Sequence, residues 1–212
     1  MCGRFTDVDL IKVIEEEFEL DEIIFDYKPN YNIAPGYTIG VVINDGKRKL
    51  VGMRWGLIPS WAKDASIGYK MINARAETIT KKPSFRTAFK KRRCLIVASG
   101  FFEWQKSGKE KIPYYIHLKS RKPFGFAGLF EHWVSPQNEH LDSCTIITTE
   151  ANEMMKQYHH RMPVIIPKEH VSLWLNPDIQ EENELLPLLK PYPSDEMAAY
   201  PVSKLVNTPR NV

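Results

Sequence analysis

Cysteine is scarce in this chain: Cys2, Cys94 and Cys144 are the three among 212 residues, and no two of them form a Cys-x-x-Cys pair. An odd, widely spaced set predicts neither a disulfide framework nor a structural zinc site. The sequence also lacks an apolar run near the roughly 18 residues of a membrane-spanning helix, and a basic segment followed by an apolar one at its start. We therefore expect a cytoplasmic protein without membrane contact, metal or cofactor.

Internal repeats, low-complexity segments and linkers rich in proline or glycine are also missing, so nothing marks a domain boundary. A chain of this length fits one domain with a substantial core. We expect residues 1–212 to form a single domain, and the protein to be a monomer.

Positive charge is concentrated in the middle of the chain. Residues 61–125 carry 16 basic and 4 acidic side chains, whereas the segments on either side are net negative. This distribution predicts a polyanionic partner for the middle segment. We expect the lysines from Lys106 to Lys111 to be a solvated face. A denser cluster is expected to contact phosphates, and it comprises Lys81, Lys82, Arg86, Lys90, Lys91, Arg92 and Arg93.

The chain begins Met1-Cys2-Gly3-Arg4-Phe5, so removal of one methionine would leave Cys2 with a free α-amine beside its thiol. The amine of such a pair condenses with an aldehyde to an imine, and the thiol then closes a five-membered thiazolidine. An α-amine titrates about two to three units below lysine and is more often nucleophilic at neutral pH. Alternatively, the thiolate attacks a carbonyl with the amine as its base, as in N-terminal-nucleophile hydrolases. Position alone is equally compatible with a small buried residue.

The hydrophobic pattern favours strands in the middle of the chain and helices elsewhere. We expect a helix capped by Asp7, and a hairpin of residues 39–43 and 50–55 that turns at Asp45-Gly46. Residues 31–36 should form a loop because Pro35 and Gly36 interrupt regular structure. Further strands are expected at 94–98, 113–118, 124–129, 145–148 and 200–207, and helices at 150–158, 167–175 and 181–189. We expect an α+β fold with a curved, mostly antiparallel, barrel-like sheet and flanking helices.

Several polar side chains are candidates for a site. Asn73 and Arg75 are two residues apart, and an extended segment would turn both to one face. Glu103 stands between aromatic residues, which raise a carboxyl pKa and suit it to act as a general acid. His159 and His160 would end the helix at 150–158, where the dipole favours the imidazolium. Neighbours on a helix point about 100° apart, so only one histidine would face a given site.

For two other residues, the sequence allows either a role in the site or a structural role. Trp61 could stack on an unpaired base or pack in the core. Asn32 could neighbour the site or form a turn.

Five segments, taken in order, closely resemble the SOS-response-associated peptidase family: Met1–Phe5, Tyr31–Gly36, Ile72–Glu77, Gly100–Trp104 and His159–Pro163. Proteins of this family shield abasic sites in single-stranded DNA. The resemblance implies that Met1 is removed, by the domain itself or by an aminopeptidase. It also implies that Cys2 becomes linked to the ring-opened deoxyribose as a thiazolidine.

The resemblance further implies roles for individual residues. Cys2 would be the nucleophile, Asn73 would orient the terminus and the sugar, Glu103 would be the acid and base, and His159 matches the histidine of the family's motif. The expected partner is single-stranded DNA with an abasic site. The residues expected to contact this DNA are Arg4, Asn32, Trp61, Arg75, Arg86, Trp104 and Arg161.

Two other functions compete with this one. Glutamine amidotransferase domains also begin Met-Cys-Gly, but they normally continue with an aliphatic residue rather than Arg-Phe, and no Asn-Gly oxyanion-loop signature occurs here. A non-catalytic single-strand binding module would use charge and stacking alone, and would bind intact and abasic strands equally.

Overall fold

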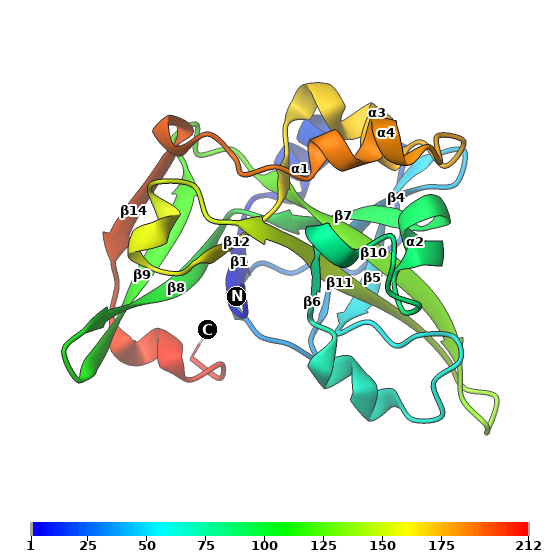
Figure 1. The fold of residues 1–212 in the computed structure, drawn as a ribbon, viewed down its shortest axis with the longest axis horizontal. Coiled ribbons are helices and arrows are strands. Elements are labelled where there is room, and N and C mark those ends of the chain that lie inside the picture. Colours follow the sequence, from blue (N-terminus) through cyan, green and yellow to red (C-terminus); the bar gives the residue numbers. More distant parts are fainter. Residues whose placement is uncertain (1, 212) are drawn as a thin grey trace.

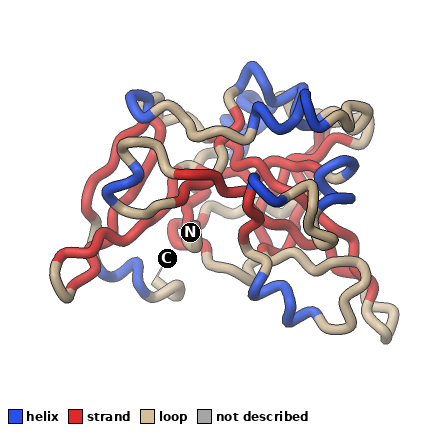
Figure 2. Tube along the Cα trace, viewed as in Figure 1, coloured by secondary structure: helices blue, strands red, loops and turns tan. Residues whose placement is uncertain are grey.

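Strands dominate the structure, and the helices lie around them, as Figure 2 shows. The computed structural model describes residues 2–211. No helix within these residues is long and apolar enough to cross a membrane.

The first sheet has the strand order β14-β9-β8-β1-β3, and every pairing in it is antiparallel. Because β1 lies inside this order, residues 5–7 are held between β8 and β3. Figure 1 shows β1, in dark blue, near the middle of the view. The strands are β14 (Met197–Pro201), β9 (Glu110–Leu118), β8 (Gly100–Ser107), β1 (Phe5–Asp7) and β3 (Asn30–Ile33).

The second sheet has the order β12-β11-β10-β7-β4-β5-β2. Its β11 also pairs in parallel with β5, at Ser143↔Arg54 and Cys144↔Trp55, which closes β5, β4, β7, β10 and β11 into a ring. The expected α+β fold with a mostly antiparallel, barrel-like sheet is therefore confirmed. The strands are β12 (Arg161–Pro163), β11 (His140–Glu150), β10 (Phe124–Val134), β7 (Arg93–Ala98), β4 (Thr38–Asn44), β5 (Arg48–Trp55) and β2 (Glu22–Ile23), with β6 (Asn73–Arg75) on β11 and β13 (Ile165–Ile166) on β10.

The helices are short, and most lie on one side of the second sheet. In Figure 1, α1 (Ile11–Phe18), α3 (Val171–Leu175) and α4 (Glu182–Leu185) gather at the top and α2 (Arg86–Lys91) lies at the right. The 3₁₀ turns are η1 (Ala65–Lys70), η2 (Ala76–Thr78), η3 (Met155–Gln157), η4 (Lys168–His170), η5 (Leu186–Leu188), η6 (Ser194–Glu196) and η7 (Lys204–Asn207).

Two hydrophobic clusters form the core. The first joins the two sheets, with Phe5 of β1 and Phe101 of β8 both edge-on to Phe126 of β10 at 5.8 Å between ring centroids. The second lies under the helices, where Phe89 of α2 and Trp174 of α3 pack against the same side of β7. Because Cys2 and Phe5 belong to the first cluster, packing between the sheets fixes the position of β1 and of Cys2 just before it.

Several expected elements differ from the structure. Asp7 does not cap α1; it is a buried residue of β1 whose Oδ1 accepts a hydrogen bond from the Tyr27 hydroxyl at 2.8 Å. Residues 30–33 are strand β3 rather than a loop, because they pair with β1 before Pro35 interrupts the chain. The hairpin of β4 and β5 is confirmed, but its turn has three residues, since Asn44 pairs with Arg48 and Gly46 takes φ +104°.

The expected helix at 150–158 is also wrong. Strand β11 extends to Glu150, and the following chain folds back so that Ala151 N–H donates to the carbonyl of His160 at 3.2 Å. Only η3 remains of the helix, with the Asn152 side chain accepting from Met155 N–H at 2.8 Å. Similarly, the expected strand at 200–207 ends at Pro201, after which Ser203 caps η7.

Arg93 was expected to contact phosphate, but it is buried and stabilises the fold. Its guanidinium donates to five backbone carbonyls at the ends of α2 and α3: those of Phe89, Lys90, Trp174, Asn176 and Ile179. Burial lowers the Arg93 pKa to about 10. Arg92, its neighbour, is paired with Glu131 at 2.8 Å.

We expect Arg93→Met to lower the free energy of unfolding by about 3 kcal/mol or more, because it leaves several buried carbonyls without donors. Urea denaturation measures this change. The exposed Arg86 on α2 provides the control, since Arg86→Met should change stability by no more than about 0.5 kcal/mol. Equal, small effects of the two substitutions would contradict the structural role of Arg93.

Candidate active site around Cys2 and Glu103

The pairing of β1 with β8 brings Glu103 close to the start of the chain. Phe5 pairs with Phe101, and Phe102 N–H donates to the Arg4 carbonyl at 2.9 Å. Glu103 follows two residues after Phe101 and is buried, with 5% of its surface exposed. The charge of Glu103 acts on the Cys2 thiol, so the two groups are electrostatic neighbours.

The pairing of β6 with β11 brings Asn73 to the same place from the second sheet. Asn73 is opposite Ile146, and its Nδ2 donates to the Cys2 carbonyl at 2.9 Å. Its Oδ1 is buried and accepts no hydrogen bond from any group of residues 2–211. A buried oxygen without a donor costs free energy, and a hydrogen bond to Asn73 Oδ1 would recover it. This oxygen is therefore available to accept a hydrogen bond.

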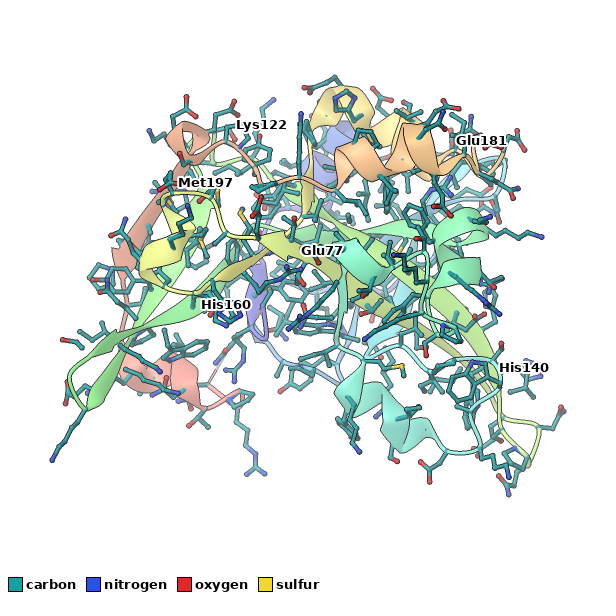
Figure 3. The ribbon with its side chains drawn as sticks, in the orientation of Figure 1. Glu77, Lys122, His140, His160, Glu181 and Met197 are labelled. Atoms are coloured by element: carbon teal, nitrogen blue, oxygen red, sulfur yellow. The ribbon has the colours of Figure 1, made fainter. Side chains whose placement is uncertain are left out.

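A cavity of about 850 Å³ opens onto Glu103, whereas Asn73 is not among its lining residues. One wall is the β8–β9 hairpin, a second is η3 with the segment that follows it, and Asn207 of η7 contributes a third. Figure 3 shows His160 near the centre of this face of the molecule. The lining residues are Glu103, Trp104, Lys106, Lys111, Lys156, Gln157, Tyr158, His159, His160 and Asn207.

Cys2 is fully buried and does not line this cavity. Its side chain packs in the first hydrophobic cluster. Burial, reinforced by the nearby Glu103 charge, raises the Cys2 pKa far above its usual value, so the sulfur is a thiol at neutral pH. These properties belong to the chain in which Met1 still precedes Cys2.

Burial also sets the protonation of Glu103. It raises the carboxyl pKa from 4.5 to about 7. The expectation drawn from its aromatic neighbours therefore agrees with the structure, and Glu103 can give or take a proton near neutral pH.

His159 is neutral at pH 7, because burial lowers its pKa to about 4. Its Nδ1 accepts a hydrogen bond from Arg161 N–H at 2.9 Å, so the proton of the neutral ring is on Nε2. The expected imidazolium at the end of a helix over 150–158 is wrong, since only the short turn η3 forms there and the partly buried ring is neutral. Both histidines line the cavity, with rings stacked 4.3 Å apart, so the expectation that one would face away is also wrong.

Three residues expected to contact DNA are hydrogen-bonded to the C-terminal segment, residues 206–211. Arg4 donates to Asn32 Oδ1 at 2.8 Å and to the Val206 carbonyl at 2.6 Å. The buried Asn32 side chain donates to the carbonyls of residues 206, 208 and 211, and Trp104 Nε1 donates to Asn207 Oδ1 at 2.8 Å. Asn32 is therefore beside the site but occupied by the chain itself.

Arg161 is likewise buried and occupied. It forms two hydrogen bonds with Glu77, at 2.5 and 3.0 Å, and one with the Thr148 carbonyl at 2.6 Å. These contacts tie β12 to η2, which follows Asn73, and Figure 3 shows Glu77 near the centre of the view. Arg161 thus fixes the two segments that carry Asn73 and His159.

Other residues expected to contact DNA are at the surface. Trp61 is 59% exposed, and Arg75 and Arg86 are exposed as well. None of these three lines the cavity with Glu103, nor does any member of the expected phosphate cluster from Lys81 to Arg93.

Sequence reasoning missed the cavity's lysines, Lys106, Lys111 and Lys156. A signal existed for Lys106, because it follows Trp104 by two residues and a strand turns such residues to one face. Lys111 is opposite Lys106 in the hairpin. Lys156 had no comparable signal, because its segment was expected to be helical.

The SOS response associated peptidase family matches residues 1–209. Abasic site processing protein YoaM of Bacillus subtilis is 52% identical over 100% of this chain and 95% of its own length. Abasic site processing protein HMCES of Xenopus tropicalis is 34% identical over 87% of this chain and 64% of its own length.

Solved structures agree with this match. A protein of Bordetella bronchiseptica has a TM-score of 0.85 and 25% identity over 95% of this chain and 100% of its own. A protein of Bacteroides thetaiotaomicron has a TM-score of 0.80 and 30% identity over 97% of this chain and 90% of its own. The chain therefore belongs to the SOS response associated peptidase family.

Proposed function

We propose that this protein processes abasic sites by forming a thiazolidine between Cys2, freed of Met1, and the aldehyde of an abasic deoxyribose in single-stranded DNA. The observation that carries the proposal is the convergence of Cys2, Asn73 and Glu103 beside a cavity that also contains His159. The relatives named abasic site processing proteins support the same substrate.

The first step is opening of the sugar. An abasic deoxyribose is mostly a closed hemiacetal, and the aldehyde appears when the C1′ hydroxyl loses a proton and O4′ gains one as the C1′–O4′ bond breaks. Glu103, with a pKa of about 7, is suited to donate the proton to O4′. Neutral His159, with its proton on Nε2, is suited to donate a hydrogen bond to a sugar oxygen.

The second step joins the sugar to the chain. The α-amine of Cys2 adds to the aldehyde, and water leaves to give an imine. The thiol then adds across the C=N bond, its sulfur to carbon and its proton to nitrogen, so that one water is lost overall. Glu103 can protonate the departing hydroxyl, and can later accept the thiol proton and pass it to the nitrogen.

Asn73 is suited to hold the reacting terminus. Its Nδ2 already donates a hydrogen bond to the Cys2 carbonyl. Its buried Oδ1 can accept a hydrogen bond from the α-amine that Cys2 gains when Met1 is removed. We include self-cleavage of the Met1–Cys2 bond in the proposal: water hydrolyses the amide, free methionine leaves, and Cys2 gains an α-amine. We expect removal of Met1 to open Cys2 to the cavity.

Denaturing electrophoresis and intact mass test the proposal. The protein is incubated with a single-stranded oligonucleotide that contains one abasic site, and with intact and tetrahydrofuran-containing strands as controls. We expect a shifted species only with the abasic strand, with the mass of the protein without Met1 plus the DNA minus one water. Absence of that species, or its presence with Met1 retained, would contradict the proposal.

A further inference from the structure

The lysines of the cavity come from two separate walls. Lys106 and Lys111 belong to the β8–β9 hairpin, and Lys156 belongs to η3. All three are exposed, and all three line the cavity that contains Glu103 and His159. The cavity is therefore acidic at one buried point and basic around its rim.

The hairpin pair is unfavourable without an anion. Lys106 and Lys111 are directly opposite each other across β8 and β9, where like charges destabilise a sheet. Neither lysine has a carboxylate within ion-pair distance in the described part of the chain. A bound anion between them would remove the repulsion.

Lys156 is available for the same anion. Its ion pair with Glu153, at 2.5 Å, lies at the surface, where such a pair contributes little. Exchange of Glu153 for a phosphate oxygen therefore costs little. Lysine is a compact point charge that suits phosphate oxygens.

We propose that Lys106, Lys111 and Lys156 form a subsite for the phosphodiester on one side of the abasic sugar, so that the strand leaves the site between the β8–β9 hairpin and η3. The subsite rests on the proposed function, which places the sugar at Glu103. It assigns the strand a path that differs from the surface of α2, where the densest lysine cluster of the sequence lies.

The test measures non-covalent affinity with an oligonucleotide that carries tetrahydrofuran, which resembles the closed sugar but cannot form an aldehyde. In the variant Lys106→Gln/Lys111→Gln/Lys156→Gln, we expect affinity to fall on the order of tenfold or more near physiological salt. Each lost phosphate contact on a single strand should reduce the slope of log affinity against log salt by about 0.7. The corresponding triple arginine variant should retain both affinity and slope.

Lys109 provides the matched control, because it lies at the turn of the same hairpin and does not line the cavity. Lys109→Gln should leave affinity and slope unchanged. Equal losses of affinity in Lys109→Gln and the triple variant would show that the lysines act through the general positive potential of the hairpin rather than as a subsite. That result would overturn the proposal.

Two shorter oligonucleotides, one ending at the tetrahydrofuran on its 5′ side and one on its 3′ side, locate the subsite. One of these two strands lacks the phosphodiester that the lysines bind, so wild type and the triple variant should bind it equally. Equal losses with both strands would overturn the subsite. Failure of the proposed function is distinct: wild type would then form no adduct with an abasic strand, whatever the lysine variants show.

Discussion

Replacing Cys2 with serine is expected to abolish the heat-stable adduct with abasic DNA. The serine variant keeps an α-amine after Met1 removal, so the imine still forms. A hydroxyl is a poorer nucleophile than a thiol and does not close an equally stable ring. The imine therefore hydrolyses, or eliminates the 3′ phosphate and cleaves the strand.

Borohydride separates these fates, because it reduces an imine to a permanent amine and leaves a thiazolidine largely untouched. We expect Cys2→Ser to yield a covalent species only when borohydride is present, whereas wild type yields one without it. Cys144→Ser is the control, since Cys144 is equally buried but belongs to β11. A heat-stable adduct in Cys2→Ser without reductant would rule out sulfur in the linkage.

Replacing Glu103 with glutamine should slow adduct formation by about 10² to 10⁴ fold, the usual contribution of a general acid or base. Glutamine keeps the size of the side chain but carries no exchangeable acidic proton. Rates are measured by quenched gel assays, with the intact mass confirming that Met1 is gone. Glu131→Gln, at another buried carboxylate, should leave the rate unchanged.

The pH dependence of the rate gives a second readout for Glu103. Two opposing effects shape the expected pH profile. Loss of the α-amine proton, near 7.7–8.0 by reference values, makes the rate rise with pH. Ionisation of Glu103, near pH 7, makes the rate fall because the carboxylate can no longer donate a proton. Glu103→Gln should keep the rising part and lose the falling part. An unchanged profile, or an equal loss of affinity for tetrahydrofuran DNA, would leave Glu103 a structural residue only.

The strands of the middle segment and the raised pKa of Glu103 could be predicted from sequence, because both follow from local apolar neighbours. The helix at 150–158 could not be excluded, since the pairing of β11 with β12 joins residues 11 to 15 positions apart, which the spacing of apolar residues within 150–158 does not reveal. The same limit applies to Arg93, Arg161 and Asn32. A basic or amide side chain looks alike in sequence whether it meets a phosphate or a backbone carbonyl.

The position of β1 inside its sheet has a mechanical consequence for an adduct. A strand of DNA joined to Cys2 would transmit any pull to the protein through β1. This strand is hydrogen-bonded to β8 on one flank and β3 on the other. A motor enzyme that runs into the lesion would pull on a strand that is hydrogen-bonded on both flanks, so the attachment point is held by both of its neighbouring strands.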